Sequence, residues 1–212
     1  METKYIVAVF VVILIVWLYK KYMLREKLSY VDSYAFHPGL ITKFKKARPE
    51  LKDDQVEVVA SALKDYFKIC QMAKKEFVSM PSQVVDDLWH EFILFTRQYQ
   101  RFCKASFGHY LHHTPAEAMP KQDMASEGIE KAWKYACQLE GINPKVPARL
   151  PRLFALDAMY NIEKGFHYVR DCKNSKNGDY CASHIGGCGS SSCGSSCGSS
   201  CGSSCSSGCG GD

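Results

Sequence analysis

Residues 5–19 carry no charged side chain and read YIVAVFVVILIVWLY. Helices of soluble proteins keep a polar face, whereas this run is apolar all round, which is typical of a membrane span. As a helix it would be about 22 Å long at about 1.5 Å per residue, somewhat short for a hydrocarbon core of about 30 Å. Lys4, Lys20 and Lys21 can extend its reach by placing their ammonium groups at the interface. We therefore expect residues 5–19 to anchor the chain in a membrane as a single pass.

The sequence around this run bears on two alternatives and on orientation. A buried core helix is disfavoured because the charged stretch KKYMLREK closes the run, and a cleaved signal peptide because no small-x-small cleavage site follows. Basic residues are concentrated after the run, at Lys20, Lys21, Arg25 and Lys27, against Lys4 before it. The positive-inside rule therefore predicts a cytoplasmic soluble domain, whose cysteines would be mostly reduced.

The middle of the chain has the apolar spacing of helices, and strand-like alternation does not persist anywhere in it. Its clearest pattern steps by three and four and predicts one helix over about residues 83–105, with Ser82 as the N-cap; the apolar positions are Val85, Leu88, Phe92, Phe95, Tyr99 and Phe102. The expected fold is all-α, a single bundle of about five helices preceded by one N-terminal transmembrane helix and followed by a disordered Cys/Gly/Ser tail. The predicted boundaries are 1–27 for the anchor and its basic flank, 28–171 for the helical domain and 172–212 for the tail.

The tail is built almost entirely of Gly, Ser and Cys, with most of its cysteines four residues apart; they are Cys188, Cys193, Cys197, Cys201, Cys205 and Cys209. Three interpretations stay open. The tail can be a low-complexity segment of little function, or a flexible chain of thiols that wraps a soft metal such as Zn(II) or Cu(I). It can also form disulfides, which a cytoplasmic location disfavours. Cys172, Cys181 and His184 lie just before the repeats and could join a metal site.

A second candidate site lies on the predicted 83–105 helix. Asp86 and His90 are four residues apart on the face opposite the apolar stripe, so they can act as paired ligands or as a carboxylate that orients an imidazole. The alternative is an ordinary solvated pair. Leu94 on this polar face suggests that something covers it, and His112 and His113 precede a predicted helix start at Thr114-Pro115-Ala116-Glu117. Asp86, His90 and one of His112 or His113 would form a three-ligand site for a divalent metal, Zn or similar, while Cys103 in the apolar stripe would be a core thiol.

The run PSQVVDDLWHEFILFTRQYQRFCKASFGHYLHHTPAEAM resembles the glycine-rich domain-containing protein-like family, and its bacterial members in particular. Their pattern has the form VDxxWHxFILxTxxYxxFCxxxFGxxLHHTP. Downstream, LPRLFALDAMYNIEKGFHY and the Cys/Gly-rich C-terminus are also similar, so that the resemblance covers about residues 35–170. Plant relatives carry WHxHxLxPxxY, where this chain has Phe92 in place of the second His and Thr96 in place of the Pro.

The resemblance implies a family domain but no biochemical activity. Carried over by position, it favours Asp86, His90, His112 and His113 as the functional set, and places His109 at a variable position. It also implies the inner (cytoplasmic) membrane of a bacterium.

Three functions remain open. The first is a membrane-anchored, non-enzymatic metal-binding protein with the Asp/His site and the thiol tail. The second is a structural or interaction scaffold without metal, and the third is a metal-dependent hydrolase. The sequence has no Gly-rich phosphate loop, nucleophile elbow or HExxH arrangement, which disfavours an enzyme. Its formal net charge of +5 is spread over the chain, so nucleic acid is not an expected partner, and no protein partner is indicated.

Overall fold

The computed structural model describes residues 2–74, 76–114, 122–170, 180–181, 185 and 208–210. Within these residues the chain forms seven α-helices, namely α1 (Glu2–Ser33), α2 (Pro38–Ala47), α3 (Asp53–Ala73), α4 (Gln83–Leu94), α5 (Thr96–Ser106), α6 (Gln122–Glu140) and α7 (Arg152–Met159). It also forms five short strands, β1 (Val78–Ser79), β2 (His112–Thr114), β3 (Tyr168–Val169), β4 (Tyr180–Cys181) and β5 (Gly208–Gly210). The prediction of an all-α fold is confirmed.

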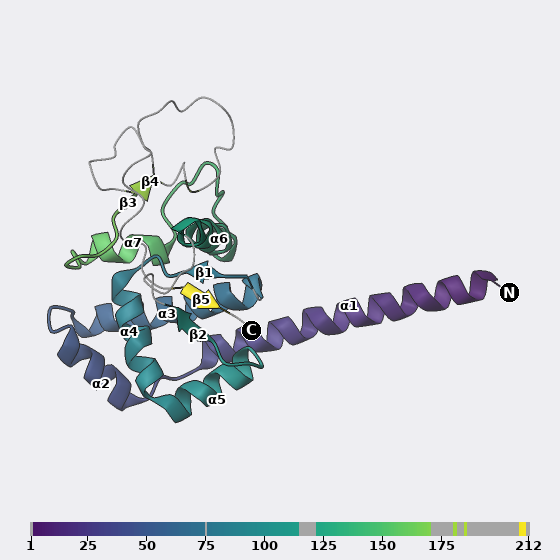
Figure 1. The fold of residues 1–212 in the computed structure, drawn as a ribbon, viewed down its shortest axis with the longest axis horizontal. Helices are drawn as coiled ribbons and strands as arrows, with labels where there is room; N and C mark the ends of the chain where they lie inside the picture. The colour runs from purple at the N-terminus through teal and green to yellow at the C-terminus, as the bar shows by residue number, and fades with distance from the viewer. Residues whose placement is uncertain are drawn as a thin grey trace.

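Helix α1 projects far out of the domain as one straight rod (Figure 1). It is long and apolar enough to cross a membrane, and none of its most apolar stretch is buried in the protein. The alternative of a buried core helix is therefore excluded. The last turns of α1 belong to the domain, because Val31 is fully buried and Lys27 donates a hydrogen bond of 3.1 Å from Nζ to the Phe107 carbonyl.

Helix α3 lies at the centre of the domain and packs against α1, α4, α6 and α7 (Figure 1). Its apolar stripe is fully buried, and two of its aromatic rings, Tyr66 and Phe67, contact the ring of Trp89 on α4. The Tyr66 hydroxyl donates to the Val78 carbonyl at 2.9 Å, which fixes β1 beside α3. The core is thus an aromatic cluster that joins α1, α3, α4 and α5.

The prediction of one continuous helix over 83–105 is wrong, because the chain bends at Phe95 between α4 and α5. Phe95 has φ −81° and ψ 57°, outside the helical region, and its amide bonds to the Phe92 carbonyl at 3.0 Å. The bend leaves the apolar stripe unbroken, since Phe92 of α4 and Tyr99 and Phe102 of α5 are all buried in one cluster. It is also why the described residues form six helices after α1 where about five were expected.

The strands form two small sheets among the described residues. In the first, β5 lies between β1 and β2 and pairs antiparallel with both, with Cys209 opposite His113. In the second, β3 and β4 are parallel. Thr114 belongs to β2, and the rest of the helix start predicted at 114–117 lies outside the described residues.

The predicted tail site falls largely outside the described residues as well. This holds for Cys172 and His184, and for Cys188, Cys193, Cys197, Cys201 and Cys205. Cys181, by contrast, is described and is disulfide-bonded. The expectation of reduced cysteines therefore does not hold for this residue.

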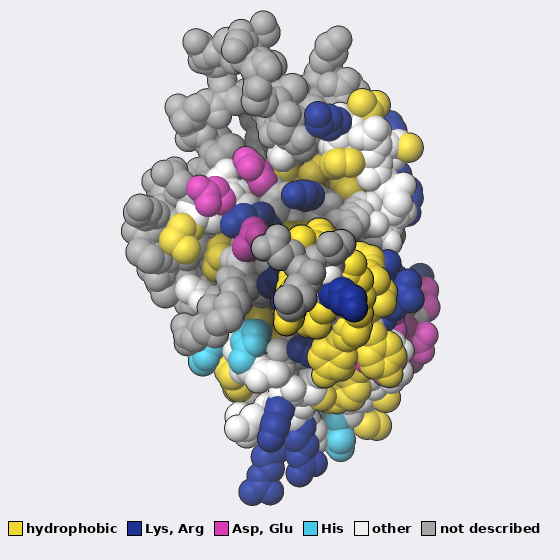
Figure 2. Space-filling view, turned by 90° about the vertical axis from the view of Figure 1, so that its right-hand side faces the viewer, with side chains coloured by type: hydrophobic (Ala, Val, Ile, Leu, Met, Phe, Trp, Pro, Cys, Tyr) yellow, Lys and Arg dark blue, Asp and Glu magenta, His cyan; other side chains and the backbone are white. Residues whose placement is uncertain are grey.

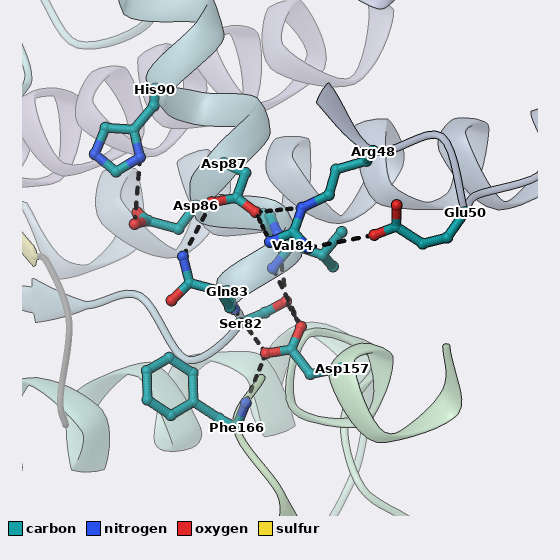
Figure 3. A network of polar contacts seen from close by, with 11 residues as sticks. Arg48, Glu50, Ser82, Gln83, Val84, Asp86, Asp87, His90, Asp157 and Phe166 are labelled. Carbon is teal, nitrogen blue, oxygen red and sulfur yellow. Dashed lines mark hydrogen bonds and ion pairs between the residues drawn. The ribbon is translucent and has the colours of Figure 1, made fainter. Parts of the chain in front are cut away.

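One buried carboxylate, that of Asp157 on α7, fixes the start of α4. It accepts hydrogen bonds from the Ser82 hydroxyl at 2.7 Å and from the amides of Gln83 and Val84 at 2.7 and 3.2 Å. It also accepts one from the Phe166 amide at 2.9 Å (Figure 3). The first amides of a helix have no partner within the helix, so an anion at this end satisfies them and interacts favourably with the helix dipole. Ser82 is the N-cap, as predicted, and accepts from the Val85 amide.

We predict that Asp157→Asn lowers the free energy of unfolding by at least about 2 kcal/mol. The amide nitrogen replaces one of the two accepting oxygens, so the buried donors that face it lose their acceptor. Urea denaturation followed by circular dichroism measures the change on the purified full chain. Asp53→Asn is the matched control: Asp53 is an exposed acid in the first turn of α3, paired with Lys45, and its loss should cost less than about 1 kcal/mol. Equal losses in the two variants would contradict the role of Asp157.

Candidate metal centre

Helix α4 presents Asp86 and His90 one turn apart on the same face. Asp86 is only 2% exposed, whereas the His90 side chain is 51% exposed. His90 Nδ1 lies 3.4 Å from Asp86 Oδ2, and the two side chains point toward each other in Figure 3. Asp86 lies in the first turn of α4, where the helix dipole favours a negative charge.

Two hydrogen bonds bring strand β2 to this face of α4. Trp89 Nε1 donates to the Tyr99 hydroxyl at 3.1 Å, and the hydroxyl donates in turn to the Leu111 carbonyl at 2.6 Å. All three groups are buried, so each bond forms where water cannot replace it. The chain therefore enters β2 directly beside α4, and His113, two residues after Leu111, reaches Asp86.

The third member of the cluster is His113. Its Nε2 lies 3.1 Å from Asp86 Oδ1, its ring centroid is 4.2 Å from that of His90, and its ring meets the Trp89 ring edge to face at 4.6 Å. The His113 side chain is 10% exposed. A carboxylate oxygen and two imidazole nitrogens thus converge, with all three ligand atoms within 4.8 Å of one another.

These separations are close to what a small divalent cation requires. Ligands at about 2.0–2.1 Å from a tetrahedral zinc ion lie about 3.3 Å apart. Asp86 contacts His113 Nε2 through Oδ1 at 3.1 Å and His90 Nδ1 through Oδ2 at 3.4 Å, so each contact is near this value but uses a different carboxylate oxygen. The longest distance between two of the three ligand atoms is at most 4.8 Å. The half-exposed His90 side chain has room to move and shorten it.

The structure distinguishes the two adjacent histidines of β2. His112 is exposed and its ring packs against Tyr110 at 4.8 Å, so that it does not join the cluster. His109 contacts Phe107 and lies outside the cluster too. Consecutive side chains of a strand point to opposite faces, which is why one of the neighbouring histidines reaches Asp86 and the other does not.

The expectation that something covers this face holds near Asp86 but not at Leu94. Leu94 suggested a covered surface, but it is 63% exposed. It is the last residue of α4, next to the bend at Phe95, and β2 covers the helix only near Asp86.

The acids that flank the pair are engaged elsewhere. Asp87 pairs with Arg48, whose Nε donates to Oδ2 at 2.8 Å, and accepts from Gln83 Nε2 at 3.0 Å (Figure 3). Glu91 forms an ion pair of 2.6 Å with Lys43. These contacts join α4 to α2 and to the residues around it, so Asp87 and Glu91 have structural roles.

The three free cysteines of the described residues are buried, and none lies at the cluster. Burial raises the pKa of the Cys103 thiol, and burial together with Glu140 raises the pKa of Cys137 to about 11. Their position keeps these thiols out of the Asp/His cluster, and the raised pKa values of Cys103 and Cys137 further disfavour the thiolate, the form that binds metals. Cys103 is a core thiol, as predicted.

Two residues that position the site were not singled out from the sequence. Tyr99 was assigned to the apolar stripe, and Asp157 lies within the apparently regular segment LFALDAMY. A signal was present for both, since a buried hydroxyl or carboxylate needs hydrogen-bond partners. The identity of those partners, however, depends on the tertiary fold.

Comparison with known proteins gives a family but no characterised relative. The profile of the UCP032817-like family matches residues 26–187. The comparisons with curated proteins and with solved structures each found no match. The matched range includes the complete Asp/His cluster.

We predict that Tyr99→Phe destabilises the domain by about 1–3 kcal/mol, because Trp89 Nε1 and the Leu111 carbonyl each lose a buried partner. Urea denaturation of the full chain measures this loss. Tyr110→Phe is the control, since Tyr110 packs against Tyr99 but is 38% exposed, and it should change stability by less than about 0.5 kcal/mol. A stable Tyr99→Phe variant would show that the hydroxyl does not hold β2.

We also predict that Cys70, Cys103 and Cys137 resist iodoacetamide in the native protein at pH 8 and react once urea unfolds it. The raised pKa values of Cys103 and Cys137 keep these thiols protonated, and burial excludes the reagent. Peptide mass spectrometry reads out each cysteine separately. Rapid alkylation of Cys103 in the folded chain would contradict its placement in the core.

Proposed function

The chain belongs to the UCP032817-like family, and we propose that it is a membrane-anchored, non-enzymatic protein that binds a divalent metal ion. One observation carries this proposal. Asp86, His90 and His113, from two separate elements, place one oxygen and two nitrogen ligand atoms within 4.8 Å of one another. The Trp89–Tyr99–Leu111 hydrogen bonds support it further, because they hold the two elements in this arrangement without an ion.

The ligand types favour zinc or a similar borderline cation. Calcium and magnesium prefer sites built entirely of oxygen, whereas two imidazoles and one carboxylate suit zinc and its neighbours. Three protein ligands leave one tetrahedral position open, unlike a structural zinc site with four. A water at that position is what the hydrolase alternative requires, and the same position can accept a thiolate.

The cysteine tail is the second part of the proposal. Its thiols would bind a soft metal or pass it on, as the repeated spacing of Cys188, Cys193, Cys197, Cys201, Cys205 and Cys209 suggests. The pairing of β5 with β2 supports a link between tail and site, because it runs Gly208–Gly210 alongside the strand that carries His113.

The membrane anchor is supported by the continuity of α1 with the domain. A cleaved signal peptide is normally followed by a separate mature domain, whereas here the apolar helix runs on to Val31 in the core.

The excess of basic residues after the run predicts a cytoplasmic domain and, with the family resemblance, the inner membrane of a bacterium. The disulfide at Cys181 points instead to an oxidising compartment. The resemblance to the glycine-rich domain-containing protein-like family stays a prediction.

A metal-free scaffold is the alternative, and one contact favours it. With Nε2 protonated, His113 donates to Asp86 at 3.1 Å and so closes β2 onto α4 without an ion. In a scaffold, added metal would leave the melting temperature unchanged and His90→Ala would act on stability alone. A metal-binding protein behaves differently, because a ligand at 100 times its Kd stabilises the fold by about 2.7 kcal/mol.

The test uses the full chain in detergent with the six tail cysteines replaced by serine, so that only the helical domain can hold the ion. We expect this protein to bind one zinc ion by calorimetry and elemental analysis, and to melt at least about 5 °C higher with excess zinc. His113→Gln in the same background should lower zinc affinity by at least about 100-fold, since it removes a direct ligand.

His112→Gln is the matched control, because His112 neighbours His113 in sequence but does not join the cluster. Its zinc affinity should stay within about twofold of the parent. No bound zinc in the parent, or equal losses in the two histidine variants, would refute the site. Comparing zinc stoichiometry with and without the tail cysteines tests the tail separately.

A further inference from the structure

A lysine-rich groove lies where α1 meets the C-terminal end of α3. It has a volume of about 610 Å³, and four of its lining residues are lysines, namely Lys20, Lys21 and Lys27 from α1 and Lys74, which directly follows α3. None of the residues that line it is acidic. Apolar side chains of both helices, including Leu24 and Met72, complete its walls.

The groove lies at the level where a membrane would end. Lys20 and Lys21 directly follow the uncharged run, and Trp17, which also lines the groove, is typical of the membrane–water interface. The helix does not bend between this level and the core, so Val31 lies only about 15 Å further along the axis from Lys21. The domain, and Lys74 with it, is therefore held close against the membrane surface.

Basic side chains surround the membrane span when the protein is viewed along it, and three of the groove lysines have distinctive local surroundings. Figure 2 looks at the side from which α1 projects, so α1 points toward the viewer and its hydrophobic side chains gather near the centre of the view, with Lys and Arg side chains around them. Lys27 is fixed by its bond to the Phe107 carbonyl, and the Lys21 ammonium lies 5.1 Å from the centre of the Trp17 ring. Lys74 has φ 61°, a strained value for a residue other than glycine and one often found at binding sites.

We propose that this groove binds the phosphate headgroup of an anionic phospholipid. Ammonium groups donate charge-assisted hydrogen bonds to phosphate oxygens, and here lysines of α1 and the lysine that directly follows α3 line one groove. The apolar walls suit the glycerol and first acyl carbons of a lipid, which inorganic phosphate lacks. The groove rests on the proposed membrane anchor and not on the Asp/His cluster, so the lipid site and the metal site can fail separately.

The test measures lipid preference beside Trp17 in the full chain. The protein has three tryptophans, and Trp89 and Trp133 are buried in the domain whereas Trp17 is 55% exposed. Brominated acyl chains quench nearby indoles, so quenching within the bilayer reports on Trp17. The chain is reconstituted in vesicles of equal parts phosphatidylcholine and phosphatidylglycerol, with bromine on one lipid or the other. We expect phosphatidylglycerol to be enriched about threefold or more beside Trp17.

Lys74→Gln should abolish most of this enrichment, although Lys74 lies outside the membrane helix. Arg25→Gln is the matched control, because Arg25 is exposed on the same flank of α1 and carries the same charge but does not line the groove. It should leave the enrichment within about 1.5-fold of the parent, because a solvent-exposed charge outside the groove is screened by salt.

Three results would overturn the proposal. Equal quenching by the two brominated lipids in the parent would show that there is no preference. Equal losses for Lys74→Gln and Arg25→Gln would show an unspecific effect of flanking charge. Loss of the enrichment when inorganic phosphate is added, at an ionic strength matched with chloride, would assign the groove to free phosphate.

Discussion

The hydroxyl of Tyr99 is the contact on which the candidate site depends. Tyr99 lies on α5. Its hydroxyl accepts a hydrogen bond from Trp89 Nε1 on α4 and donates one to the Leu111 carbonyl just before β2, so two hydrogen bonds join three segments. Because all of these groups are buried, any other path of the chain would leave polar atoms unpaired at a substantial cost. The position of His113 over Asp86 follows from this constraint.

The start of α4 is fixed in a comparable way. Asp157 gathers donors from the start of α4 and from the segment after α7, and it sets where the first turn of α4 lies. Asp86 is in that first turn. The cluster is therefore built on a helix held by Asp157 at its start and by the Trp89–Tyr99 bond near its middle. Such rigidity lets a site keep its geometry when no ion is bound.

The sequence predicts local features well and non-local ones poorly. Helical periodicity alone put Asp86 and His90 on one face, opposite the core, and identified Ser82 as the N-cap. It could not choose between His112 and His113, because that choice depends on how β2 lies against α4. Nor could it find the bend at Phe95, where no Gly or Pro marks a break, or the partners of Asp157 at the start of α4, which lie more than 70 residues away in the chain.

The most direct test of the metal centre is X-ray absorption spectroscopy of the zinc-loaded full chain whose six tail cysteines are replaced by serine. The geometry predicts a first shell of nitrogen and oxygen at about 2.0–2.1 Å, with the outer-shell scattering of two imidazoles from His90 and His113. A sulfur shell at about 2.3 Å, or a protein that retains no zinc, would contradict the account.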